Sequence, residues 1–314
     1  MTQSDLTKND IKQILSSYSV DEYKNHWPLQ SGPKRTIYII KTSGGKYVIK
    51  VFEKYDPDNL LFTISVQEFA INNNLPIPRI EQTKNGEPLS EYRGKGIVIQ
   101  KFHDGRHPKR YSDCLLKNMA STFAKLNKTL MQYPLAEKSA WRVDHQFLSD
   151  HLATKAFDFN IKKEQEKLIN EMPNIVRCKL RRSLIHGDLN SNNFLVNKKK
   201  ITAIIDWEKC REDYIAYDIA VFLIEIIHQS KGRLQNHVKL YLQEYEKYLQ
   251  LNNEERKAIY YFIKMHMLVI MNWLKKQLKK QPHREILIKK EAQQTIAKYF
   301  CFNKLTLEQF INFL

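Results

Sequence analysis

Residues 184–196 read LIHGDLNSNNFLV, residues 204–207 read IIDW and residues 217–220 read YDIA. In these stretches polar residues interrupt runs that are otherwise apolar. Short apolar runs predict buried strands, and the Asp and Asn residues between them predict tight loops. We therefore expect a loop carrying Asp188 and Asn193 to lead into a strand, and Asp206 to end the partner strand of a hairpin.

The polar residues are of the types that phosphoryl transfer requires. The reaction needs an acceptor hydroxyl in line with the γ-phosphate, and oxygen ligands that hold Mg²⁺ across the triphosphate. Asp188 and Asn193 lie five positions apart across the predicted loop. One carboxylate can then face the hydroxyl, while the Asn193 amide and the Asp206 carboxylate face the metal.

The motif His-Gly-Asp-x-x-x-x-Asn, followed by Ile-Asp-Trp and Tyr-Asp-Ile-Ala, resembles the aminoglycoside phosphotransferase and choline kinase family. The resemblance implies an α+β, protein-kinase-like fold of two lobes, with ATP and Mg²⁺ as cofactors. It implies that Asp188 is the catalytic aspartate, which orients the hydroxyl and accepts its proton. Asn193 and Asp206 would be magnesium ligands, and His186 and Asp218 would support the catalytic loop.

A plainer interpretation is that these residues are turn formers and helix caps, because Asp and Asn are favoured there. Asp218 can be both, since it precedes an apolar helix predicted at Ile219–Ile227. A neutral His186 bonded to backbone explains that residue as well as any direct role. The joint spacing of Asp188, Asn193 and Asp206 is what capping alone leaves unexplained.

The N-terminal half offers an independent test of a kinase-like fold, which needs a strand lysine for the α- and β-phosphates. Lys50 lies in the apolar run Tyr47–Phe52, where a lysine is costly unless it is paired or binds an anion. The alternative is that Lys50 points out of a one-sided sheet. Glu68, on a helix predicted at 58–73, is the candidate carboxylate partner, with a solvent-exposed glutamate as the alternative.

Other nucleotide contacts are weakly specified. The chain has neither Gly-x-x-x-x-Gly-Lys-Ser/Thr nor Gly-x-Gly-x-x-Gly, so no glycine-rich phosphate loop is expected. By the resemblance, residues 31–36 would cover the triphosphate, with backbone amides and the Ser31 hydroxyl as donors. Adenine would meet the backbone from Gln100 to Phe102.

The order of patterns predicts two domains. A hairpin at 36–52 and strands between 78 and 102 make residues 1–102 a β-rich, nucleotide-binding lobe. Residues 103–314 are dominated by helical patterns at 112–130, 145–170, 217–229 and from 237 onwards, and they carry the catalytic loop and substrate site. The hairpin of Phe194–Val196 with Ile201–Ile205 is the clear strand pair of that half.

Composition excludes some classes of protein. The chain has 314 residues and a formal net charge of +17. No run approaches the roughly 18 to 20 apolar residues of a membrane span, and the first residues lack the pattern of a signal peptide, so we expect a cytoplasmic protein with no membrane partner. Lysine runs at 275–276, 279–280 and 289–290 fall on helical patterns, which favours solvated helix faces.

The acceptor is less clearly indicated. Residues 47–105 and the spacing from Asp206 to Asp218 are similar to the homoserine-kinase-like branch, whereas His-Gly-Asp is closer to the antibiotic kinases. The basic helical lobe favours a neutral, zwitterionic or anionic acceptor over a polycation, since polycation sites need many carboxylates. An aminoglycoside or another antibiotic stays the alternative. The side chains considered for the acceptor cleft are Glu208, Asp213, Glu225, His228 and Trp273.

Other functions fit less well. A protein kinase needs an activation segment, and the eleven residues between Asp206 and Asp218 are too few for one. A kinase-like binding protein without activity would not need Lys50 and Asp188 together. A basic nucleic-acid-binding module would show interleaved aromatics or a recognisable motif, so no nucleic-acid partner is expected.

Overall fold

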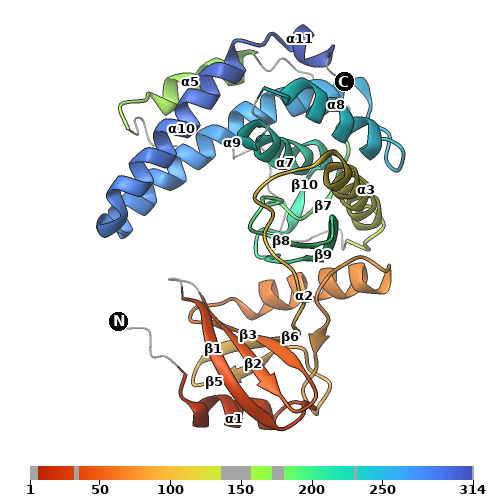
Figure 1. Ribbon diagram of the computed structural model, residues 1–314, viewed down its shortest axis with the longest axis vertical. Coiled ribbons are helices and arrows are strands. Elements are labelled where there is room, and N and C mark those ends of the chain that lie inside the picture. Colours follow the sequence, from red (N-terminus) through yellow and green to blue (C-terminus); the bar gives the residue numbers. More distant parts are fainter. Residues whose placement is uncertain (1–5, 32–34, 136–156, 172–179, 230–231, 313–314) are drawn as a thin grey trace. The chain divides into compact units, whose positions relative to one another are not determined.

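The computed structural model describes residues 6–31, 35–135, 157–171, 180–229 and 232–312 (Figure 1). The Cα positions divide into two compact units. The first contains residues 1–106, 195–197 and 202–208, and the second contains residues 107–194, 198–201 and 209–314. Each unit is described separately below.

The first unit is built on an antiparallel sheet with the strand order β1-β2-β3-β6-β4, and β5 also pairs with β6. The predicted hairpin is β2 and β3, joined by a turn at the Ser-Gly-Gly signal. One helix precedes the sheet and another follows β3. The elements are α1 (Lys8–Ser16), β1 (Tyr23–Ser31), β2 (Arg35–Thr42), β3 (Lys46–Phe52), α2 (Pro57–Asn72), β4 (Ile80–Glu81), β5 (Ser90–Tyr92) and β6 (Lys95–Lys101).

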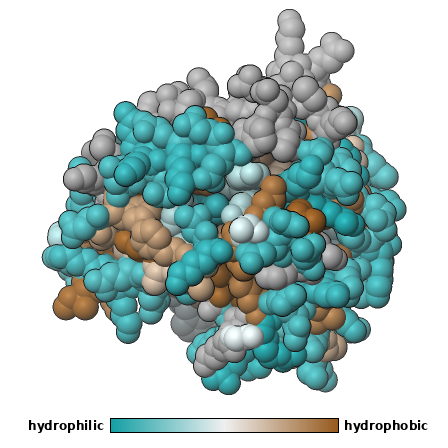
Figure 2. All heavy atoms as spheres, turned by 90° about the horizontal axis from the view of Figure 1, so that it is seen from above, coloured by the Kyte–Doolittle hydropathy of each residue, from teal (hydrophilic) through white to brown (hydrophobic). Residues whose placement is uncertain are grey.

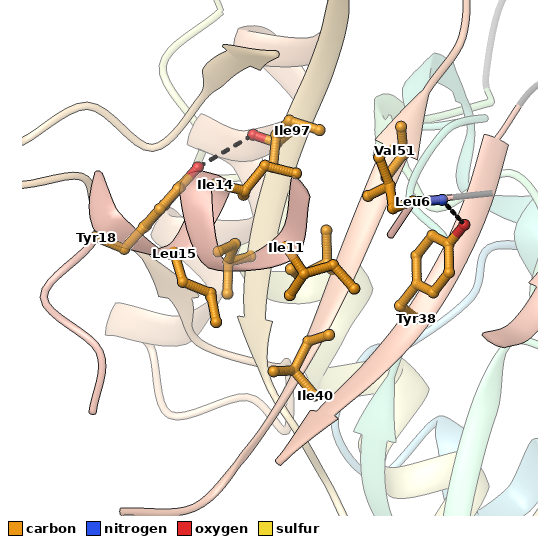
Figure 3. Packing of buried hydrophobic residues seen from close by; sticks show 11 residues of the cluster. Leu6, Ile11, Ile14, Leu15, Tyr18, Tyr38, Ile40, Val51 and Ile97 are labelled. Carbon is orange, nitrogen blue, oxygen red and sulfur yellow. Dashed lines mark hydrogen bonds between the residues drawn. The ribbon is translucent and has the colours of Figure 1, made fainter. Parts of the chain in front are cut away.

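The two faces of this sheet carry different residues because neighbours along a strand point to opposite sides. One face packs on α1 (Figure 3), where Tyr38, Ile40 and Val51 meet residues of the helix such as Ile11. Two hydrogen bonds reinforce this core: the Tyr18 hydroxyl donates to the Ile97 carbonyl, and the Leu6 amide donates to the Tyr38 hydroxyl.

The opposite face carries α2, whose Ile64 packs on Phe52, Ile80 and Val98 (Figure 1). The strand register places Arg35 opposite Phe52, and Ile37 opposite Lys50. Directly paired residues share a face, so Arg35 and Lys50 lie on the same side of the sheet as Phe52. The first unit therefore presents two cations beside α2.

The second unit is mostly helical, and it also contains a small sheet. Helix α7 packs on α9, α3 packs on α8, and α10 packs on α9. The predicted helix at 112–130 begins after Ser112, whose hydroxyl accepts a hydrogen bond from the Leu115 amide. The helices are α3 (Asp113–Leu130), α5 (Ile161–Glu171), α7 (Ile215–Gln229), α8 (Leu234–Tyr245), α9 (Asn253–Lys280), α10 (Glu285–Asn303) and α11 (Leu307–Ile311). Positions 145–156 of the predicted helix at 145–170 lie outside the described residues.

Short strands frame the stretch quoted first. Strand β8 (Phe194–Asn197) and strand β9 (Lys200–Ile204) form the predicted hairpin. A second pair was not predicted: β7 (Arg182–Ile185) runs antiparallel to β10 (Arg211–Tyr214). The view that the β8–β9 hairpin is the one strand pair of the C-terminal half was therefore wrong, because the charged sequence of β10 hides its strand character.

The lysine runs of α9 and α10 lie mostly on solvated helix faces, as predicted. Within the described ranges, each helix is too short or too polar to cross a bilayer. The face drawn in Figure 2 is covered mostly by hydrophilic residues. In the lysine runs of α9 and α10, Lys275 is half-buried and the other lysines are exposed, namely Lys276, Lys279, Lys280, Lys289 and Lys290.

Candidate active site

The catalytic loop begins where β7 ends. Asp218 lies in the first turn of α7 and is fully buried. Its Oδ2 accepts a hydrogen bond from the His186 amide at 3.0 Å, and its Oδ1 accepts one from the Gly187 amide at 2.8 Å. The Asn127 side chain also donates to Asp218 Oδ2, at 3.1 Å. Asp218 therefore bonds to the start of the loop, and it is not a cap that precedes its helix.

Burial raises the pKa of Asp218, because a carboxylate loses hydration inside the protein. The charge of His186, the Gly187 and His186 amides, and the Asn127 side chain oppose this shift. Asn127 is itself held by the Tyr245 hydroxyl, which donates to Asn127 Oδ1 at 3.0 Å. His186 is also fully buried, so both predicted supporting residues lie in the protein interior at the start of the loop.

Gly187 has a backbone conformation and surroundings that favour glycine. Its φ is +76°, in the left-handed region that side chains disfavour. A Cβ at this position would lie 2.4 Å from Arg211 Nη1 and 2.5 Å from the Lys209 carbonyl oxygen. The loop can therefore turn towards Asp188 only because residue 187 has no side chain.

Asp188 and Asn193 meet across the loop. The Asn193 Nδ2 donates to the Asp188 carbonyl oxygen at 2.8 Å and to Asp188 Oδ2 at 3.0 Å. These bonds leave Asn193 Oδ1 as the atom of that side chain suited to a metal. Asn193 is held in place by the next residue, because Phe194 is fully buried against Phe123 and Phe222.

Lys209 is a residue that the sequence did not single out. Its Nζ lies 2.9 Å from Asp188 Oδ1, while the Asp188 side chain is 15% exposed. Both carboxylate oxygens of Asp188 thus have a donor from the second unit itself. No motif marks this lysine in a chain so rich in lysine.

In the first unit, Asp206 follows β9 with φ +66°, a left-handed conformation that is uncommon outside glycine. Its Oδ1 accepts from Arg35 Nη1 at 2.9 Å and its Oδ2 accepts from Arg35 Nη2 at 2.8 Å. Arg35 also contacts the Glu208 carboxylate. Arg35 lies within the segment 31–36 that was predicted to cover the triphosphate, but the prediction named backbone amides and the Ser31 hydroxyl and not the Arg35 side chain.

Lys50 belongs to the same group. Burial and then the Arg35 charge lower the pKa of Lys50 to about 8, whereas the Asp206 carboxylate opposes the shift. The predicted partner Glu68 makes no ion pair among the described residues, so its assignment gains no support. The adjacent residue Gln67 does reach the sheet, because its Oε1 accepts a hydrogen bond from Gln100 Nε2 at 3.1 Å.

The remaining nucleotide predictions fall at the ends of β1 and β6. Ser31 ends β1 opposite Thr36, and residues 32–34 lie outside the described part of the chain. At the other end, the Lys101 amide donates to the Arg79 carbonyl at 2.8 Å, and the Phe102 amide donates to the Lys46 carbonyl at 3.1 Å. These two amides therefore already have backbone acceptors, and the contact of adenine with this segment stays a prediction.

The oxygen atoms of Asp206 and Asn193 suit a magnesium ion that is completed by phosphates and waters better than a metal ion held by protein side chains alone. Among the described residues no group of three or more His, Cys, Asp or Glu side chains could hold a metal ion. Mg²⁺ commonly takes one or two protein oxygens and completes its shell with phosphates and waters. Asp206 in the first unit and Asn193 in the second each offer such an oxygen, and their convergence on one ion stays a prediction.

On the second unit, Glu225 of α7 lies close to the catalytic loop. Burial raises the pKa of Glu225, hydrogen bonds from Ser191 and the charge of Lys298 lower it, and the charge of Asp188 raises it further. Burial also raises the pKa of Tyr111, with the Glu225 charge as the next cause. Tyr111 and Lys298 therefore lie within electrostatic range of Glu225, and Glu225 lies within electrostatic range of Asp188.

The other side chains considered for an acceptor have different roles or positions. Glu208 contacts Arg35, and Asp213 accepts hydrogen bonds from Arg211 at 3.0 and 2.8 Å. Trp273 is 52% exposed. The side chain of His228 lies outside the described part of the chain.

Comparisons with known proteins point to one family of enzymes. A model of the phosphotransferase enzyme family matches residues 28–251. The chain is 21% identical over 224 residues to a homoserine kinase of Rhodopseudomonas palustris, covering 70% of this chain and 69% of that protein. A homoserine kinase of Nitrobacter hamburgensis is 23% identical, with the same coverage.

Solved kinases share the fold. A microcompartment-associated aminopropanol kinase superposes with a TM-score of 0.75 at 14% identity, covering 95% of this chain and 99% of that one. An amicoumacin kinase in complex with AMP-PNP and Ca²⁺ gives 0.72 at 12% identity, covering 96% and 95%. The predicted α+β, protein-kinase-like fold class is thereby confirmed.

Proposed function

This chain belongs to the phosphotransferase enzyme family, and on that premise we propose that it transfers the γ-phosphate of ATP to a hydroxyl of a small molecule in the cytoplasm. The observation that carries the proposal is the loop from His186 to Asn193. Asp218 fixes the backbone of this loop, and Asn193 fixes the carboxylate of Asp188. A carboxylate held in this way is suited to orient a hydroxyl.

In the proposed reaction, the acceptor oxygen attacks the γ-phosphorus while the bond from that phosphorus to the β–γ bridging oxygen breaks. The proton of the hydroxyl passes to the Asp188 carboxylate, and ADP leaves with the bridging oxygen. Lys50 binds the α- and β-phosphates. Asp206 and Asn193 would hold the magnesium ion, which would neutralise charge on the phosphates.

For the acceptor, we propose a small zwitterionic or neutral amino alcohol of the homoserine type. Glu225 lies within electrostatic range of Asp188, and Lys298 interacts with Glu225, so this region offers one carboxylate and one ammonium to an acceptor carrying an amine and a carboxylate. An aminoglycoside, with several ammonium groups, would find fewer carboxylate partners than it needs. The homoserine kinases among the relatives support the same class.

The test is release of ADP with magnesium and a panel of acceptors. The panel should contain homoserine, aminopropanol, choline, spectinomycin and an aminoglycoside, with Asp188→Asn as the blank. We expect turnover with homoserine or a related amino alcohol that the Asp188→Asn variant lacks. Turnover restricted to an antibiotic would support the alternative acceptor class, and ADP release with none of the compounds would count against the proposed acceptors.

A separate measurement addresses nucleic acid. Binding of nucleic acid that falls steeply with salt and is indifferent to ATP would favour a nucleic-acid-binding role. We expect the protein to bind ATP instead. We also expect the Asp206→Ala variant to lose magnesium-dependent turnover. Normal magnesium-dependent turnover by that variant would reject Asp206 as a ligand.

A further inference from the structure

Arg35 begins β2 and points to the same face of the sheet as Lys50. Its guanidinium bonds to both oxygens of Asp206, at 2.9 and 2.8 Å, in the two-pronged geometry that arginine makes with planar anions. The Arg35 and Asp206 side chains are only 17% and 26% exposed. This pair is therefore largely shielded from water, in contrast to an ordinary surface ion pair.

The charges around Arg35 balance within the first unit. Arg35 and Lys50 contribute two positive charges, and Asp206 and Glu208 contribute two negative charges. A guanidinium keeps its charge at any physiological pH, and its planar donors match phosphate as well as they match carboxylate. Arg35 is thus the one permanent guanidinium in this described group, and both of its present partners are anions.

We propose that Arg35 is a phosphate-binding residue that exchanges Asp206 and Glu208 for the β- or γ-phosphate of the nucleotide. The inference rests on the proposed function. If Asp206 ligates magnesium, the metal draws negative charge from the carboxylate and weakens its hydrogen bonds from Arg35. A largely shielded cation that loses its partner is costly, and an incoming phosphate replaces the partner with another planar set of oxygens.

The exchange differs from a purely structural role for Arg35. If Arg35 only balances Asp206 and Glu208, Arg35→Lys keeps the positive charge and leaves the affinity for metal-free nucleotide unchanged. If Arg35 binds phosphate through its paired donors, both Arg35→Lys and Arg35→Met weaken nucleotide binding even without a metal. The measurement that separates these roles is ATP affinity in the presence of a chelator.

We would titrate ATP by calorimetry into wild type, Arg35→Met, Arg35→Lys and Arg93→Met, each with EDTA and with excess magnesium. Arg93 is the matched control, since it also pairs with a carboxylate of the first unit, Asp10, at 2.9 Å. Asp10 belongs to α1, on the opposite face of the sheet. Methionine keeps most of the side-chain length and removes the charge.

We expect Arg35→Met to weaken ATP binding in EDTA by about tenfold to a hundredfold, the range for hydrogen bonds to a charged group. Arg35→Lys should give a smaller loss, because it keeps the charge without the paired donors. Arg93→Met should bind ATP like wild type. Unchanged or tighter binding by Arg35→Met in EDTA overturns the proposal.

Glu208→Gln tests the same exchange in the opposite direction and does not depend on the stability of the Arg35 variants. Removing one competing anion should tighten ATP binding in EDTA by up to about fivefold, as expected for a partly exposed ion pair. Weaker binding by this variant overturns the exchange. If wild type binds no ATP with excess magnesium, the proposed function fails. If wild type binds ATP and Arg35→Lys or Arg35→Met binds it equally well in EDTA, the inference alone is rejected.

Discussion

Asp218 Oδ1 lies 2.8 Å from the backbone nitrogen of Gly187, although 31 residues separate them in the sequence. A second bond joins the other oxygen of Asp218 to the His186 amide. The buried carboxylate thus satisfies two consecutive amides at the start of the catalytic loop, and it sets the direction in which the chain leaves β7 towards Asp188. This side chain couples helix α7 to the start of the loop.

Asp218→Asn should lower both turnover and stability. An asparagine can accept a hydrogen bond with only one oxygen, so its amide group would face a loop N–H. We expect unfolding free energy to fall by about 1–3 kcal/mol, because burial already penalises the carboxylate and offsets part of the loss. Displacement of Asp188 should reduce kcat by about a hundredfold.

Denaturant melts and steady-state kinetics check this expectation, with Asp113→Asn as the control. Asp113 is an exposed aspartate of α3 that pairs with Arg233. A variant at Asp218 that keeps wild-type kcat would show that the loop holds its shape without these bonds.

Gly187→Ala should destabilise the protein by more than its backbone conformation alone explains. The control is Gly86→Ala, because Gly86 has φ +85° and no atom within 4 Å of an added Cβ. Gly86→Ala should cost about 1–2 kcal/mol, the penalty of the left-handed region. Gly187→Ala adds contact with the Lys209 carbonyl, a backbone atom, and should cost about 1–3 kcal/mol more. Equal midpoints in urea for the two variants would disprove this packing effect.

Local patterns predicted the elements that depend on neighbouring residues in the chain. The β2–β3 hairpin follows from alternating apolar residues and a glycine turn, and α3 follows from Ser112 and a helical period. The loop from His186 to Asn193 was found because its polar residues interrupt apolar strands. Short-range rules contain enough information for such features.

These short-range rules could not predict contacts between residues that are distant in the sequence. Lys209 and Arg35 each bond to a predicted site carboxylate, yet neither differs in its sequence context from many other basic residues. On α2, the acidic character of Glu68 suggested a partner for Lys50, but the adjacent Gln67 faces the sheet. Successive side chains of a helix point about 100° apart. Whether Gln67 or Glu68 faces the sheet therefore depends on how α2 packs, which the sequence does not show.

Asp188→Asn should lower turnover by about 10²–10⁴-fold, the usual contribution of a positioned acid or base. Asparagine cannot take the proton of the hydroxyl. ATP affinity should stay nearly unchanged, because Lys50, Arg35 and Asp206 remain intact. The control is Asn192→Ala, an exposed position on the same loop, which should keep wild-type turnover. Full activity in Asp188→Asn would remove Asp188 from the mechanism.

ATP affinity should fall as pH rises past about 8, because the pKa of Lys50 is lowered to about 8 from an ordinary value of 10.5. Between these values the unfolded chain binds more protons at this residue than the folded chain does. Because the folded protein releases the Lys50 proton first, folding becomes more favourable as the pH rises through that window. The same loss of the Lys50 charge weakens phosphate binding. Stability and nucleotide affinity should move in opposite directions.

Lys50→Arg separates these effects, because a guanidinium stays charged throughout the window. Calorimetric titrations of ATP from pH 7 to 9.5 should show a declining affinity for wild type and a flat profile for Lys50→Arg. ATP itself is fully ionised over most of this range, so the nucleotide does not mask the change. Parallel profiles for the two proteins would mean that Lys50 does not bind the phosphates as a titrating ammonium.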